Sequence, residues 1–206
     1  MAYAVGVISQ YMQSPRESHG AAIKHILRYL RGTTGYIIKY ERMGQRRLIG
    51  YSDSSHNVDP DDGKSTTGHI FYYGSSPISW CSQKQDTVVL SSCEVEFMAA
   101  TATACQAIWL QDLFGEIMNK AQEKVILKVD NNSAIQRTKN PVFYGRSKHI
   151  HTRFHFIRNC VENEQVKVEY IPSEEQRAGI LTKPLVRTKF KEMRNLIGVE
   201  EFSRRT

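Results

Sequence analysis

The sequence predicts an α/β fold with a mixed sheet, because strand and helix patterns follow one another in a distinctive order. Strand patterns at residues 47–51, 68–73 and 78–81 are separated by turn residues, which predicts an antiparallel meander. The run Val125–Val129 is almost continuously apolar and predicts a strand that is covered on both faces. Helical patterns lie on both sides of this run, so we expect parallel pairing there.

The helices are marked by apolar spacing and by caps. Residues 17–31 carry apolar side chains at helical spacing and end at Gly32. A long helix from about 92 to 118 begins at a capping box, in which Ser91 is the N-cap and Glu94 folds back. Further helices are expected at residues 131–139, 147–163 and 189–196.

Two further strand patterns flank this framework. Residues 36–40 precede the strand at 47–51, and the polar residues 43–45 between them predict a hairpin. Residues 166–171 predict the last strand of the sheet. Pro172 then begins a short helix that contains Gly179, although a glycine in a helix costs about 1 kcal/mol relative to alanine.

Composition restricts the class of protein. The 206 residues suffice for one domain with an appendage, or for two small domains. No run approaches the roughly 18 consecutive apolar residues that a membrane span needs, and the first residues lack the features of a secretion signal. We therefore expect an intracellular protein, cytoplasmic or nuclear, with no membrane partner. The four cysteines form no C-x-x-C pair, which disfavours zinc and fits a reducing compartment.

The charge of the chain indicates a polyanionic partner. The formal net charge is +7 and the isoelectric point is about 9.2. Residues 146–158 carry three histidines and four fixed cations, and aromatic side chains are interleaved with them. A basic stripe of this kind is typical of nucleic-acid binding. The alternative is a solvated helix face without a partner.

Three acidic residues stand where a catalytic centre can form. Asp53 lies late on an early strand, Asp130 closes the most apolar strand, and Glu96 lies in the first turns of the long helix. Ligands gather beyond the carboxyl ends of parallel strands, so Asp53 and Asp130 can meet there. Each acid also has a structural interpretation: Asp53 can begin a turn, Asp130 can cap a helix, and Glu96 can favour the helix dipole.

Together the three acids predict a site for hard cations. Glu94 and Glu96 point to nearly opposite sides of a helix, and the cap occupies Glu94, so Glu96 is the acid that can face a metal. Carboxylates without histidine or cysteine suit Mg²⁺ or Mn²⁺. Two such ions about 4 Å apart are a common device for cleaving phosphodiesters. The net charge of +7 fits such a substrate.

Several long motifs resemble one family. The chain closely resembles the ribonuclease H domain of copia-type LTR retrotransposon polyproteins in the segments YSDSSH (51–56), GKSTTGHIFYYGSSPISWCSQKQDTVVLSSCEVEFMAA (63–100), VDNNSAI (129–135), SKHIHTRFHFIR (147–158) and YIPSEEQRAGILTKPL (170–185). Residues 3–33 are similar to the end of the reverse transcriptase region. We therefore expect an N-terminal extension at 1–45 and a ribonuclease H-like domain at 46–206. The initial Met1 suggests a retrotransposon fragment that became a separate gene.

The resemblance implies both a fold and an activity. The fold is a five-stranded mixed sheet with helices on both faces, and the activity is two-metal hydrolysis of the RNA strand of RNA–DNA hybrids. Gly179 stands where the family has its fourth acidic ligand, so we expect one ion to be held weakly and the activity to be reduced. Glu175, about one helical turn earlier, is an alternative ligand. The ligands that match the family are Asp53, Glu96 and Asp130.

Hybrid binding is expected to use generic contacts. Lys148, Arg153 and Arg158 can meet phosphates. The helix start at Asn131, Asn132 and Ser133 suits one phosphate. Because the fourth acid is missing, an impaired module that binds nucleic acid or a partner protein is the alternative to an enzyme.

Overall fold

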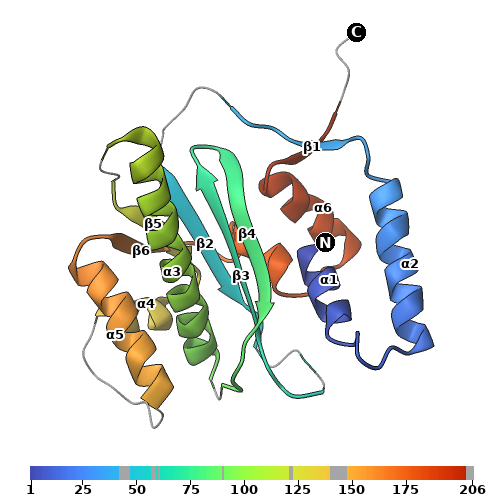
Figure 1. Cartoon of the computed structure of the whole chain (residues 1–206), viewed down its shortest axis with the longest axis horizontal. Coiled ribbons are helices and arrows are strands. Elements are labelled where there is room, and N and C mark those ends of the chain that lie inside the picture. Colours follow the sequence, from blue (N-terminus) through green and yellow to red (C-terminus); the bar gives the residue numbers. More distant parts are fainter. Residues whose placement is uncertain are drawn as a thin grey trace.

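A five-stranded mixed sheet forms the centre of the molecule (Figure 1). The computed structural model describes residues 1–41, 47–56, 59, 61–89, 91–120, 123–139 and 148–202. The strand order is β4-β3-β2-β5-β6; β2 pairs antiparallel with β3 and β3 with β4, whereas β2–β5 and β5–β6 are parallel. This confirms the predicted meander and the predicted parallel pairs. The strands are β2 (Leu48–Ser54), β3 (Thr66–Tyr73), β4 (Ser76–Lys84), β5 (Val125–Val129) and β6 (Val166–Tyr170).

Helices cover both faces of the sheet (Figure 1). One face carries α3 (Ser92–Met118), α4 (Asn132–Lys139) and α5 (Lys148–Glu162). The other face carries α1 (Ala2–Ser9), the 3₁₀ helix η1 (Arg177–Leu181) and α6 (Arg187–Leu196). Alternation along β3 serves both layers, because Phe71 packs under α3 while Ile70 and Tyr72 pack against η1 and α6. The predicted α/β class with helices on both faces is confirmed.

The predicted hairpin between residues 36–40 and 47–51 is wrong. β1 (Tyr36–Ile38) pairs antiparallel with β7 (Val199–Glu201), a strand that the sequence analysis did not predict, in a separate two-stranded sheet. The reason is that β2 lies in the interior of the large sheet, where β3 and β5 occupy both of its edges. The predicted turn at 43–45 lies outside the described residues.

The segment around Gly179 forms a 3₁₀ helix, whereas an ordinary short helix beginning near Pro172 was predicted. Gln176 sets its start, because the buried side-chain amide donates to Ser52 O at 2.8 Å and its oxygen accepts from the Ala178 amide at 3.3 Å. These bonds attach the beginning of η1 to β2. The segment therefore follows the sheet instead of forming a longer helix.

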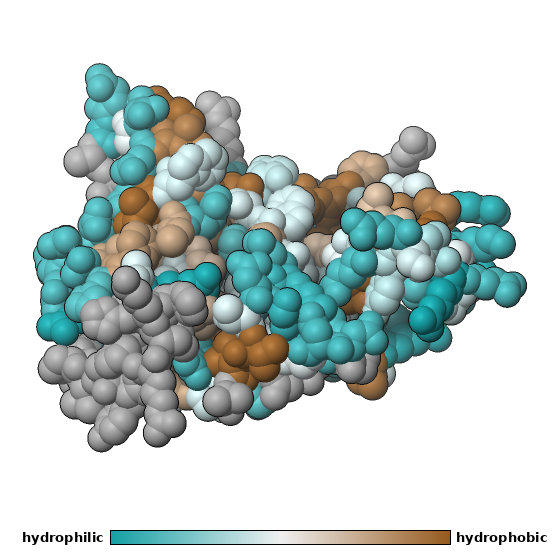
Figure 2. Space-filling model, turned by 60° about the horizontal axis from the view of Figure 1, so that its bottom comes forward, coloured by the Kyte–Doolittle hydropathy of each residue, from teal (hydrophilic) through white to brown (hydrophobic). Residues whose placement is uncertain are grey.

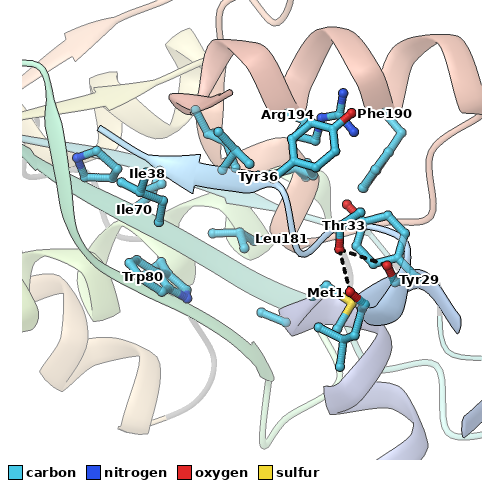
Figure 3. Close-up of a pocket in the computed structure, with 16 residues that line it drawn as sticks. Met1, Tyr29, Thr33, Tyr36, Ile38, Ile70, Trp80, Leu181, Phe190 and Arg194 are labelled. Carbon is cyan, nitrogen blue, oxygen red and sulfur yellow. Dashed lines mark hydrogen bonds between the residues drawn. The ribbon is translucent and has the colours of Figure 1, made fainter. Parts of the chain in front are cut away.

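The N-terminal segment packs on the rest of the chain. Tyr11 in the turn after α1 donates to Asp61 at 2.6 Å, and Tyr29 of α2 (Glu17–Arg31) lies edge-on to Phe190 at 5.8 Å. An apolar cavity of about 250 Å³ lies between this segment, the sheet and α6, and Trp80 borders it (Figure 3). No helix among the described residues is long and apolar enough to cross a bilayer.

Gly68→Ala is expected to destabilise the fold by about 1–3 kcal/mol, because it crowds the contact between β3 and η1. A Cβ at Gly68 would lie 2.7 Å from Thr182 Cγ2 and 2.8 Å from Leu181 Cβ. Urea unfolding of the variant measures this loss. Gly20→Ala is the matched control, because a Cβ on this exposed position of α2 meets no atom within 4 Å and is expected to stabilise the helix.

Candidate active site

The three predicted acids converge at the carboxyl ends of β2 and β5. Ser52 pairs with Val129, so the next residues, Asp53 and Asp130, lie side by side on neighbouring parallel strands. Glu96 approaches from the start of α3. One carboxylate oxygen from each acid lies within 4.8 Å of the other two. Figure 2 turns the bottom of Figure 1 toward the viewer, and the coloured part of the surface is mainly hydrophilic there, with separate apolar patches.

The cap of α3 holds Glu96 in place. The Ser91 side chain accepts a hydrogen bond from the Glu94 amide at 3.3 Å, as the predicted N-cap requires. The helix begins there, so Glu96 lies just above the end of β2. Glu96 Oε1 accepts from the Ser54 amide at 3.3 Å.

The second oxygen of Glu96 is buried and has no hydrogen-bond partner among the described residues. Only 9% of the residue is exposed. Burial, together with the charges of Asp53 and Asp130, raises the pKa of Glu96 to about 8. This unpartnered buried oxygen, beside two other carboxylates, could serve as a ligand of a cation.

Asp53 is the most enclosed of the three acids, with 2% of the residue exposed. Its Oδ2 accepts a short hydrogen bond from the Thr182 hydroxyl and lies 3.6 Å from Lys183 Nζ. Burial raises the pKa of Asp53, whereas Lys183 and Thr182 oppose that rise and Asp130 adds to it. Asp130 is more accessible, and its Oδ2 accepts from Ser173 Oγ at 2.9 Å.

The hydroxyl groups that bind Asp53 and Asp130 were not predicted from the sequence. Thr182 and Ser173 lie in the segment 170–185 that resembles the family, but no local pattern indicates that their hydroxyls reach Asp53 and Asp130. Both residues follow β6, and only the return of the chain over the sheet brings them to the carboxylates.

Gly179 faces Asp53. A Cβ at this position would lie 3.8 Å from Asp53 Oδ2 and 3.9 Å from Lys183 Cε, both ordinary contact distances. A longer side chain at 179 would therefore enter the carboxylate group. Glu175, the alternative fourth ligand, is exposed and lies outside the three-carboxylate group found among the described residues.

The predicted nucleic-acid contacts have other local partners. Asn131 Oδ1 accepts from the Ala134 amide at 3.0 Å and so caps α4, while Asn132 and Ser133 are exposed. Arg158 binds Glu162 one turn later on α5 at 2.6 Å, and Arg153 Nη1 lies 3.5 Å from Met98 Sδ. The side chain of Lys148 lies outside the described part of the chain. The role of these residues in hybrid binding stays a prediction.

The donor set fits a hard divalent cation. Asp53, Glu96 and Asp130 offer only carboxylate oxygens, the ligand type that Mg²⁺ and Mn²⁺ prefer. Three carboxylates this close repel one another unless a cation joins them. The unpartnered Glu96 Oε2 supplies an open ligand position.

Glu96→Gln is expected to raise the melting temperature of the metal-free chain at pH 9 by about 4 °C or more. The pKa of Glu96 rises from 4.5 to about 8 on folding, so the folded state holds this proton more tightly. Ionising Glu96 therefore costs stability as the pH rises through this range. Melting curves in a chelator at pH 5 and pH 9 measure the effect; a gain as large at pH 5 would contradict it.

Comparison with known proteins places the chain in a family. No protein-family model matches it. The retrovirus-related Pol polyprotein of transposon TNT 1-94 from Nicotiana tabacum is 40% identical over 199 residues, 97% of this chain. The Pol polyprotein of transposon RE1 from Arabidopsis thaliana is also 40% identical over 97% of the chain. Over 97% of its length, the chain is homologous to a part of copia-type retrotransposon Pol polyproteins.

The chain spans only a small part of the length of these relatives. It spans 15% of the tobacco polyprotein and 14% of the Arabidopsis polyprotein. Secreted RxLR effector protein 161 of Plasmopara viticola is 42% identical over 110 residues, which are 53% of this chain and 78% of the effector.

Solved structures are similar to this chain in fold. The foamy viral protease–reverse transcriptase dRH in complex with double-stranded DNA has a TM-score of 0.51 at 15% identity, over 76% of this chain and 24% of the viral chain. LC11-RNase H1, isolated from compost, in complex with an RNA/DNA hybrid has a TM-score of 0.48 at 17% identity, over 66% and 94% of the two chains. The predicted five-stranded mixed sheet with helices on both faces is confirmed.

Proposed function

We propose that this chain is a divalent-metal-dependent ribonuclease H-type endonuclease that cleaves the RNA strand of RNA–DNA hybrids, and that Gly179 weakens its activity. The observation that carries this proposal is the convergence of Asp53, Glu96 and Asp130 within 4.8 Å on a ribonuclease H-like sheet. The buried, unpartnered oxygen of Glu96 supports it further.

Asp53, Glu96 and Asp130 would hold the cation. When bound, a divalent ion would activate water and neutralise charge on the phosphate that is cleaved. The contacts of the chain fix the carboxylates beforehand, because Ser54 orients Glu96, Thr182 orients Asp53 and Ser173 orients Asp130. Groups that are already in place need no reorganisation during the reaction.

Substrate binding would rely on charge and shape. The net charge of +7 favours a polyanion, and Asn132 and Ser133 are exposed directly beyond Asp130 at the start of α4. Discrimination of RNA from DNA would use the 2′-hydroxyls across the shallow minor groove of the hybrid. The partner that we propose is therefore an RNA–DNA hybrid.

Cleavage of end-labelled substrates tests the proposal. The purified chain is incubated with Mg²⁺ or Mn²⁺ and with an RNA–DNA hybrid, single-stranded RNA, duplex RNA or duplex DNA of the same sequence. We expect cleavage of the RNA strand of the hybrid alone, and no cleavage in a chelator. Equal cleavage of single-stranded RNA would contradict the proposal.

A second function is a binding module without catalysis. Gly179 favours it, because the side chain that would complete the acidic group beside Asp53 is missing. The module would bind nucleic acid or a partner protein. If the chain and Gly179→Asp both fail to cleave the hybrid, while hybrid binding persists and weakens steeply with salt, the module is the better description.

A further inference from the structure

Asp53 Oδ2 already has a cation beside it. Lys183 Nζ lies 3.6 Å from this oxygen, and the Thr182 hydroxyl donates to the same atom. A side chain at Gly179 would enter the same space, because its Cβ would contact both Asp53 Oδ2 and Lys183 Cε. The Gly179 side of Asp53 therefore has a positive group from the chain and, among the residues that the structure describes, no further carboxylate.

Local structure directs Lys183 to this place. Thr182 ends η1, and its hydroxyl bond to Asp53 fixes the backbone just before the lysine. Pro184 follows and restricts the backbone of Lys183. The Lys183 side chain is 46% exposed, so its ammonium group lies at the mouth of the site while Asp53 is buried.

We propose that Lys183 acts as a built-in counter-cation on the Gly179 side of Asp53, and that the site binds one divalent ion and not two because position 179 carries no carboxylate. This inference rests on the proposed function because it concerns the same carboxylates. When all three are ionised, Asp53, Glu96 and Asp130 carry three negative charges, and Lys183 balances one of them. One divalent ion balances the remaining two, whereas a second ion would meet the ammonium group and, among the described residues, no fourth carboxylate.

Calorimetric titration with Mn²⁺ alone tests this proposal. We expect one Mn²⁺ per unsubstituted chain at low ionic strength. Lys183→Gln is expected to tighten this binding about tenfold while the stoichiometry stays at one, because it removes a nearby like charge but adds no ligand. Lys189→Gln is the matched control, because Lys189 is also a half-exposed lysine in an ion pair, at 40% side-chain exposure, but its partner is Glu192. This control is expected to change the affinity less than twofold.

Position 179 supplies the second arm of the test. Gly179→Asp is expected to bind a second Mn²⁺, whereas the neutral isostere Gly179→Asn is expected to bind one. Two ions on the unsubstituted chain, or equal affinities for Lys183→Gln and Lys189→Gln, would overturn the proposal. If the titrations agree but no hybrid is cleaved, the proposed nuclease function fails and the single-ion site stands.

Discussion

Gly179→Asp is expected to raise the rate of hybrid cleavage by about 100-fold in Mg²⁺. The substitution places a carboxylate beside Asp53 Oδ2, where the structure has ordinary contact distances for the new Cβ. The added charge would hold a second cation against Lys183 and would complete the acidic group that the family resemblance implies. Initial rates on a labelled hybrid measure the gain.

Two variants separate charge from packing at this position. Gly179→Asn fills the same volume without charge, and Gly179→Ala adds only the Cβ. Both are expected to leave the rate within a few-fold of the unsubstituted chain, because neither adds an anionic ligand. If Asn raises the rate as much as Asp does, a missing carboxylate is not what limits the activity.

Asp130→Asn is expected to lower hybrid cleavage by at least about 1,000-fold, while hybrid binding persists. Asparagine can still accept the hydrogen bond from Ser173, so the geometry is kept while one of three metal-binding charges is lost. The expected defect therefore lies in catalysis and not in folding. Single-turnover cleavage together with a hybrid-binding isotherm separates the two effects.

Asp112→Asn is the control for the loss of one acidic charge. Asp112 lies at an exposed position of α3, outside the acidic group, and its substitution is expected to leave the rate unchanged. A comparable loss of activity in both variants would show that overall charge, rather than the site, governs cleavage.

The central acids could be predicted because their signals are local. Asp53 lies at the next-to-last position of β2, Asp130 directly follows β5, and the cap at Ser91 fixes the register of Glu96 on α3. Parallel pairing of β2 and β5 then leaves little freedom in where the acids meet. Local patterns therefore indicated that these acids can meet, whereas the five-stranded sheet and the full ligand set were expected from the family resemblance.

Contacts made by the return of the chain could not be predicted in this way. Thr182 and Ser173 approach Asp53 and Asp130 only after β6, and the buried amide of Gln176 converts the expected helix into η1. The hairpin prediction for β1 failed for a similar reason, because local pattern does not reveal that both edges of β2 are occupied.

The contacts of the basic stripe at residues 146–158 could be predicted only in part. Arg158 and Glu162 are four residues apart on α5, so their ion pair was readable from helical spacing. The contact of Arg153 with Met98 joins two helices and had no such signal. Part of the stripe therefore makes contacts within the chain. Its role in hybrid binding stays a prediction, which substitution of Arg153 and Arg158 would test.

Anomalous diffraction from crystals soaked in Mn²⁺ tests the central claim most directly. We expect a Mn²⁺ peak within about 2.5 Å of carboxylate oxygens from Asp53, Glu96 and Asp130, in the unsubstituted chain. The same crystals of Asp130→Asn are expected to show a weaker peak or none. Strong Mn²⁺ peaks elsewhere, with none between these three side chains, would contradict the account.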